Sequence, residues 1–227
     1  MMDYATVESL IRAIAPDVSD RPIYLLDAQE WHVPRDVGFG VQGFTSGMLD
    51  LTMAAQLSQR GRWHGRGFAT ILFPDNMPTS PRCITGVILH ELSHYLTFSD
   101  EVRTCEIEAD LETASAIATA LFCDAENAAV VDEQRRPPWH HHESDFARAA
   151  AHLAFRYCKR VEGAFPWDLQ FSRAYYGTCE MAFMRVLGPE LRRMAAEPIR
   201  AVLHEAPPPE FTDLVRCLTS WWDAEEK

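Results

Sequence analysis

His90-Glu91-Leu92-Ser93-His94 lies inside an apolar stretch that runs from Ile84 to Phe98. On an α-helix, two residues four positions apart lie about 40° apart around the axis and about 6 Å apart along it. Both imidazoles can therefore reach one Zn²⁺ through bonds of about 2.0–2.1 Å. Glu91 projects from the neighbouring strip, where it is better placed to accept a proton from a metal-activated water than to bind the metal. The stretch predicts a metal-binding helix that carries its own base.

The flanking residues indicate where this helix begins and ends. Ser80-Pro81 reads as an N-cap followed by a proline at the first helical position, so we expect a helix over residues 81–98. Only Arg82 and Glu91 bring a formal charge into it, which is typical of a buried helix with one functional stripe. The alternative interpretation is an ordinary hydrogen-bonded cluster of two histidines and a glutamate.

A catalytic zinc site also needs a third protein ligand and an open position for water. Thr97 and Asp100 stand where a Gly and a third His would complete the extended H-E-x-x-H-x-x-G-x-x-H pattern, so that pattern is not present. Ser99-Asp100-Glu101 instead predicts a polar turn, and apolar residues at three- and four-residue spacing predict a second helix over residues 101–123. The third ligand is therefore expected on this second helix.

Two helices joined by so short a turn tend to pack antiparallel. If the turn centres near Asp100, Glu106 faces His94 and Asp110 faces His90. We predict Glu106 as the third ligand and Asp110 as an acceptor for the free N–H of a ligating histidine. The other candidates for the third ligand are Glu108, Glu112 and the later histidines.

Two segments carry a resemblance to a known group of enzymes. Residues 87–96, Val-Ile-Leu-His-Glu-Leu-Ser-His-Tyr-Leu, resemble the long signature of zincin metallopeptidases. Residues 106–110, Glu-Ile-Glu-Ala-Asp, are similar to the E-x-x-A-D/N segment of gluzincin-type families, notably HtpX-type and ImmA/IrrE-type peptidases. The resemblance covers roughly residues 81–123. It implies zinc at His90, His94 and Glu106, with Glu91 as the base.

The remaining sequence predicts an α+β fold, a mostly helical zincin-like domain with a small sheet and a helical C-terminal part. At 227 residues and 47% hydrophobic, the chain can form one sizeable domain. We expect a metallopeptidase core over residues 1–130 and a helical part over 131–227 that packs on it. Expected strands span 22–28 and 67–73; expected helices span 4–15, 48–59, 143–161, 168–187, 189–197 and 209–223. By the resemblance, residues 66–73 could be an edge strand that binds extended substrate, although a core strand fits equally.

Composition excludes several classes of partner. A net charge of −12 argues against a general nucleic-acid-binding surface, since phosphate contacts need clustered Lys and Arg. No apolar stretch is long enough to cross a bilayer, and the first residues do not resemble a signal peptide. The six cysteines are widely spread without C-x-x-C pairs, which favours free thiols in a reducing cytoplasm. The sequence does not indicate an oligomeric state.

Trp139-His140-His141-His142-Glu143 offers further donors. One of His140, His141 and His142 could stabilise an oxyanion or replace the third ligand, or the run could be a solvent-exposed loop. His152 is expected to be a hydrogen-bonded helix histidine. The first hypothesis is therefore a cytoplasmic zinc metallopeptidase that acts on peptides or proteins. The alternative is an inactive zincin-like binding or regulatory module with a structural zinc.

Overall fold

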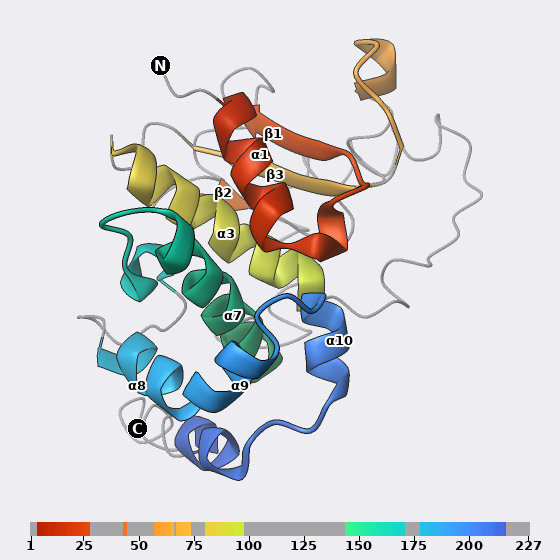
Figure 1. Cartoon of the computed structure of the whole chain (residues 1–227). Helices are drawn as coiled ribbons and strands as arrows, with labels where there is room; N and C mark the ends of the chain where they lie inside the picture. Colours follow the sequence, from red (N-terminus) through yellow and green to blue (C-terminus); the bar gives the residue numbers. More distant parts are fainter. Residues whose placement is uncertain are drawn as a thin grey trace, which may run out of the picture.

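The computed structural model describes residues 4–27, 43–44, 57–65, 67–73, 80–97, 144–170 and 178–216 (Figure 1). Its first part contains helix α1 (Tyr4–Ile14), a short 3₁₀ helix η1 (Pro16–Val18), strands β1 (Ile23–Asp27), β2 (Gly43–Phe44) and β3 (Phe68–Leu72), and helix α3 (Pro81–Thr97). The expected elements over 4–15, 22–28, 67–73 and 81–98 are therefore confirmed to within about two residues at each end. Within the described residues, no helix is both long enough and apolar enough to cross a bilayer.

The sheet is small and mixed, in the order β1-β3-β2. β1 runs parallel to β3 with Ile23 opposite Phe68, and β2 runs antiparallel to β3 with Phe44 opposite Ile71. β3 is thus the central strand, and all five of its residues are buried. The expectation that residues 66–73 form an edge strand for extended substrate is wrong, because β3 has a pairing strand on each side.

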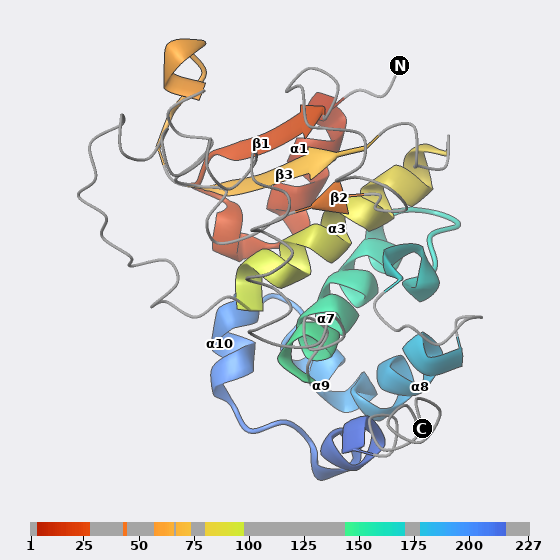
Figure 2. The same ribbon diagram turned by 180° about the vertical axis from the view of Figure 1, so that it is seen from behind.

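Alternation along the strands separates two hydrophobic clusters on opposite faces of the sheet. Phe68 and Leu72 belong to the main core, together with buried residues of α1 and α3. Ala69 and Ile71, one position out of phase, belong to a smaller cluster that includes Leu57 and is packed by Trp63. This is the period-two pattern of a strand buried on both faces. The helices of the main core lie together on one side of the sheet (Figures 1 and 2).

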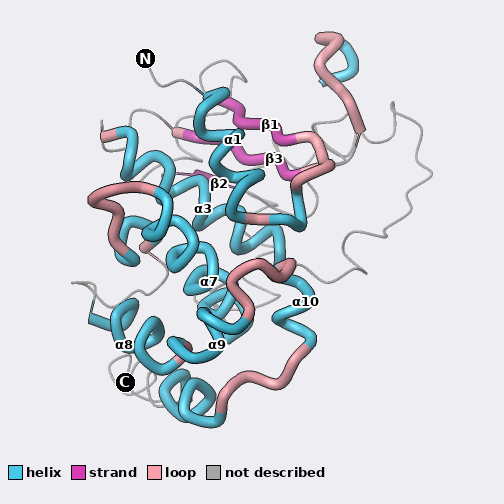
Figure 3. The backbone as a smooth tube through the Cα atoms, in the orientation of Figure 1, coloured by secondary structure: helices cyan, strands magenta, loops and turns pink. Residues whose placement is uncertain are grey.

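The second described part is helical. It contains α7 (Ser144–Arg160), the 3₁₀ helix η4 (Pro166–Leu169), α8 (Thr178–Val186), α9 (Gly188–Arg193) and α10 (Ile199–His204), and residues 209–216 are also helical (Figure 3). α7 packs against α3, and its alanine-rich surface is buried along most of its length. Residues of α7, α9 and α10 share the main core with α1 and α3. The expected division at residue 130 lies outside the described residues.

At the coarse level of an α+β protein that is mostly helical with a small sheet, the expected fold class is confirmed. The helix expected over 168–187 was wrong at its start, because residues 166–169 form the separate 3₁₀ helix η4, and the described residues of α8 are Thr178–Val186. Helix α10 was not expected at all. The helix expected over 48–59 is described only at 57–59, and the second motif helix over 101–123 lies outside the described residues.

Candidate metal centre

Helix α3 holds the motif residues in a buried setting. The Ile84 N–H donates to the Ser80 carbonyl at 3.1 Å, and the Thr85 hydroxyl donates to the Pro81 carbonyl at 2.9 Å. The first is the opening i→i−4 bond of the helix, which makes Ser80 the residue that precedes its first turn, and the second is a side-chain bond back to a carbonyl in that turn. Beyond them, most of the helix from Thr85 to Leu96 is buried, so the motif lies deep in the protein.

The three motif residues are arranged as the helical spacing predicts. His90 and His94 are each half-buried, and Glu91 is only 6% exposed. The two imidazole rings lie edge to face, with centroids 5.0 Å apart and planes at 73°. Two imidazoles bound to one tetrahedral Zn²⁺ through bonds of about 2.0–2.1 Å would also have centroids about 5 Å apart. The donor chemistry and the ring separation therefore fit a zinc ion shared by the two histidines.

Phe146, near the start of α7, packs against both histidines. Its ring stacks on His94 at a centroid distance of 4.2 Å and meets His90 edge to face at 5.0 Å. Phe146 is 1% exposed, so its ring is fixed by the core. Metal bonding uses the lone pair in the plane of an imidazole, whereas stacking uses the face of the ring. The stacked contact thus restrains the His94 ring without lying in the plane of its nitrogen lone pairs, and the edge-to-face contact restrains the His90 ring.

A backbone carbonyl determines the tautomer of His90. Nδ1 of His90 lies 2.8 Å from the Leu169 carbonyl oxygen at the end of η4. Because a carbonyl can only accept, Nδ1 carries the hydrogen, and the neutral ring has its lone pair on Nε2. Burial lowers the pKa of His90 to about 4, although the carbonyl groups of Leu169 and Gln170 favour the protonated form. At neutral pH the ring is therefore uncharged, the form that a metal ligand requires.

The other expected site residues cannot be placed beside this pair. Glu106, Glu108, Asp110, Glu112 and the histidines His140, His141 and His142 all lie outside the described residues. Across the ranges given above, no cluster of three or more His, Cys, Asp or Glu side chains suited to a metal is found. The described part of the chain therefore contains two of the expected ligands and the expected base on one helix, and the metal site with its third ligand remains a prediction.

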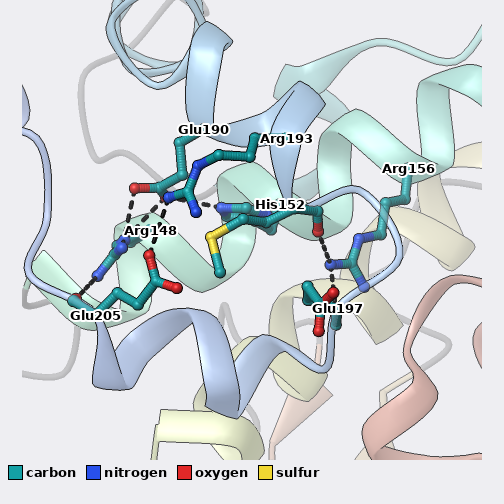
Figure 4. Close-up of polar contacts among 8 residues, drawn as sticks. Arg148, His152, Arg156, Glu190, Arg193, Glu197 and Glu205 are labelled. Atoms are coloured by element: carbon teal, nitrogen blue, oxygen red, sulfur yellow. Dashed lines mark hydrogen bonds and ion pairs between the residues drawn. The ribbon is translucent and has the colours of Figure 1, made fainter.

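A second polar stripe runs along α7. Arg148, His152 and Arg156 recur every four residues, and all three are buried. Arg148 donates Nε–H and Nη2–H to the two carboxylate oxygens of Glu190 at 3.0 and 2.9 Å, and its Nη1–H to the Glu205 carbonyl at 2.7 Å (Figure 4). The fork of the guanidinium thus ties α7 to α9 and to the end of α10.

Glu190 also accepts from His152, whose Nε2 lies 2.8 Å from Oε1. Burial would raise the pKa of Glu190, but hydrogen bonds from His152 and Arg148 outweigh it and hold that pKa at about 2. Burial lowers the pKa of His152, so the pair consists of an ionised carboxylate and a neutral imidazole that donates through Nε2. The expectation that His152 is a hydrogen-bonded helix histidine is confirmed.

Arg156 completes the stripe by binding backbone carbonyls. It donates Nη1–H to the carbonyl of Ile14 at the end of α1 at 2.9 Å. Its Nη2–H groups donate to the carbonyls of Met194 and Glu197 at 3.0 and 2.6 Å (Figure 4). Ile14 and Met194 lie at the C-terminal ends of α1 and α9, and Glu197 lies just before α10. The α7 stripe therefore has a structural role that the sequence did not reveal.

Sequence reasoning also missed Phe146 and Leu169, which contact the histidine pair from α7 and η4. Phe146 gave no signal, since a phenylalanine on an apolar helix face usually marks core packing alone. Leu169 contributes its carbonyl group, which no side-chain pattern predicts. The one available signal was Gly86, because glycine inside a helix costs about 1 kcal/mol relative to alanine and often marks a close approach.

No family model matches the chain, and neither the curated proteins nor the solved structures include a significant match to it.

Proposed function

We propose that this protein is a zinc-dependent metallopeptidase of the gluzincin type that hydrolyses peptides or proteins in the cytoplasm. The observation that carries the proposal is the arrangement on α3: two imidazoles with centroids 5.0 Å apart, and a buried Glu91 on the adjacent strip of the same helix. A structural histidine pair would not require a buried carboxylate beside it, since burying a carboxylate is costly.

Each residue has a separate role in this proposal. His90 and His94 would hold Zn²⁺, with Glu106 as the proposed third ligand. When bound, Zn²⁺ would lower the pKa of a water molecule and polarise the carbonyl of the scissile bond. Glu91 accepts the proton of the attacking water and then delivers it to the leaving amine. Phe146 and the Leu169 carbonyl hold the imidazoles in the orientation that binding requires.

The first test replaces the base and leaves the ligands. Glu91→Gln preserves the size of the side chain but removes its capacity to accept a proton. We expect this variant to bind zinc like the wild type and to lose hydrolysis by about 10²- to 10⁴-fold. Casein and a mixture of unrelated peptides serve as probes, with cleavage read by mass spectrometry. Glu210→Gln, on the exposed surface of the last helical segment, is the matched control. Undiminished cleavage by Glu91→Gln would refute the mechanism.

One observation favours the alternative of a structural zinc in a binding module. Ser144 begins α7 directly after the segment that contains His140–His142, and Phe146 two residues later contacts both α3 imidazoles. A fourth ligand from that segment would close the site to water, as in structural zinc centres. Two results together would support this alternative. The wild type would contain zinc but cleave none of the probes, and a variant with His140–His142 replaced by alanine would bind zinc more weakly than the wild type.

A further inference from the structure

Four residues at four-residue spacing form a stripe along α3: Arg82, Gly86, His90 and His94. The segment 163–170, which follows α7 and contains η4, contacts this stripe at its first three positions. The histidine pair is therefore only one end of a longer contact between the motif helix and the C-terminal part. The first half of the stripe has no role in the chemistry described above.

Gly86 allows the segment to approach the helix closely. A Cβ atom built on Gly86 would overlap the backbone carbonyl group of Asp168. Backbone atoms cannot move away by a change of rotamer, so any larger residue at position 86 must push η4 away from α3. Leu169 is the next residue, and its carbonyl oxygen lies 2.8 Å from Nδ1 of His90, one helical turn beyond Gly86. A hydrogen bond of this length does not tolerate such a displacement.

Asp168 and Arg82 hold the segment in place. The buried Asp168 carboxylate accepts from the Phe165 N–H at 2.8 Å and pairs with Nε of Arg82 at 3.3 Å. Nη1 of Arg82 donates to the Gly163 carbonyl at 2.5 Å, and its guanidinium lies over the Phe165 ring. The 3₁₀ helix is thus connected to the first turn of α3 at several points.

Immediately after Leu169, the backbone adopts an uncommon conformation. Gln170 has φ 48° and ψ 41°, in the left-handed region that residues other than glycine seldom occupy. Such residues persist where the surrounding structure fixes them, and they cluster at functional sites. The left-handed turn ends η4 at the residue whose carbonyl reaches His90.

We infer that Gly86, Arg82 and Asp168 are positioning residues for the metal site, acting by holding the Leu169 carbonyl against Nδ1 of His90. This inference rests on the proposed function, because it assumes that His90 binds zinc through Nε2. A histidine whose second ring nitrogen donates to a fixed acceptor keeps one tautomer and one ring orientation, and loss of such an acceptor typically weakens metal binding about 10- to 100-fold. The C-terminal helical part thereby becomes a component of the metal site.

The test uses the full chain with Gly86→Ala and measures two quantities. Zinc affinity is measured by competition with a chromogenic chelator, and the tautomer of His90 in the zinc-free protein is read from long-range ¹H–¹⁵N NMR spectra at neutral pH. We expect zinc affinity to fall about 10- to 100-fold and the Nδ1–H signature of His90 to be lost or mixed. The matched control is Gly188→Ala on α9, where an added Cβ would meet only the Arg192 guanidinium, at 3.5 and 3.9 Å. Both quantities should be unchanged in that variant.

A second variant covers the case in which Gly86→Ala does not fold. Asp168→Ala removes both the hydrogen bond to Phe165 and the ion pair with Arg82, without adding an atom to the contact. It should weaken zinc binding about tenfold and alter the His90 tautomer. If folded Asp168→Ala bound zinc as tightly as the wild type and kept the Nδ1–H signature of His90, the inference would be overturned. Failure of the proposed function is distinguishable, because the wild type itself would then bind no zinc while the tautomer measurement could still be made.

Discussion

Helices α3 and α7 each carry a polar stripe with four-residue spacing, and the two stripes use their polar groups differently. On α7, Arg148 and His152 form hydrogen bonds with the Glu190 carboxylate, and Arg156 donates to backbone carbonyls at or near the ends of helices. On α3, His90 bonds to a carbonyl through Nδ1, and the rings of His90 and His94 pack on Phe146. This hydrogen bond of His90 uses Nδ1, the ring nitrogen opposite the one proposed to bind the metal, whereas the His152 bond uses Nε2 on a buried carboxylate. Helical spacing alone therefore does not separate a proposed metal ligand from a structural histidine, and the partners of each ring have to be compared as well.

The largest effect expected within this comparison comes from breaking the ion pair of the α7 stripe. Arg148→Met leaves the Glu190 carboxylate buried without its guanidinium, and we expect the free energy of unfolding to fall by about 3–5 kcal/mol. Chemical denaturation monitored by circular dichroism measures this loss. Arg193→Met is the matched control, since Arg193 pairs with Glu205 at a similar 2.9 Å but is 61% exposed. That variant should lose far less stability, because solvent screens an exposed ion pair. Equal losses in the two variants would contradict the structural role of the α7 stripe.

The free energy of unfolding should also depend on pH through the Glu190 carboxylate of this ion pair. The pKa of Glu190 is lowered from 4.5 to about 2 in the folded protein, so the unfolded chain binds a proton first as pH falls. The stability that Glu190 contributes is present above about pH 4.5 and is lost as the pH falls towards 2, a change of about 3 kcal/mol. His152, whose pKa is also lowered, adds a loss that begins below its ordinary value of 6.5.

Denaturation midpoints between about pH 7 and pH 2.5 measure this dependence. Glu190→Gln should flatten the part of the curve below about pH 4.5, because the variant has no carboxylate to protonate at this position. Curves of equal slope in the wild type and in Glu190→Gln would show that the pair does not couple folding to protonation.

A smaller effect is expected at the N-terminus of α10. The Asp17 carboxylate accepts from the N–H groups of Ile199 and Arg200 at 2.7 and 3.0 Å, and so caps a helix that begins 182 residues later in the chain. Asp17→Ala should lower the free energy of unfolding by about 1 kcal/mol, and Asp17→Asn should lose less because its amide oxygen can still accept. Denaturation midpoints distinguish the two. If Asp17→Ala left the free energy of unfolding unchanged, α10 would not depend on this cap.

The sequence predicted those parts of the fold whose causes are local. α1, β1, β3, α3 and α7 follow from hydrophobic periodicity and from flanking proline residues, and each was expected within a few residues of its observed bounds. α10 and η4 could not be predicted in this way. α10 has six residues and takes its cap from Asp17, and η4 is held by the contacts of Asp168 and Arg82. Short elements of this kind depend on tertiary contacts, which a single sequence does not display.

The residues of the candidate site also divide into those set by local sequence and those brought together by tertiary contacts. His90, Glu91 and His94 could be predicted because four-residue spacing on one helix is a local property. The Phe146 ring and the Leu169 carbonyl come from α7 and η4, so their proximity is a consequence of the fold. Glu106, Asp110 and the histidines His140–His142 lie outside the described residues, and their predicted roles stay predictions.

The most direct test of the difference between the two stripes is zinc stoichiometry by plasma mass spectrometry on tag-free protein. Wild type, His94→Ala and His152→Ala are compared after purification and after reconstitution with zinc. We predict equimolar zinc in the wild type and in folded His152→Ala, and a marked loss of zinc in His94→Ala. A folded wild type without zinc after reconstitution, or loss of zinc in His152→Ala alone, would contradict the assignment of the metal site to α3.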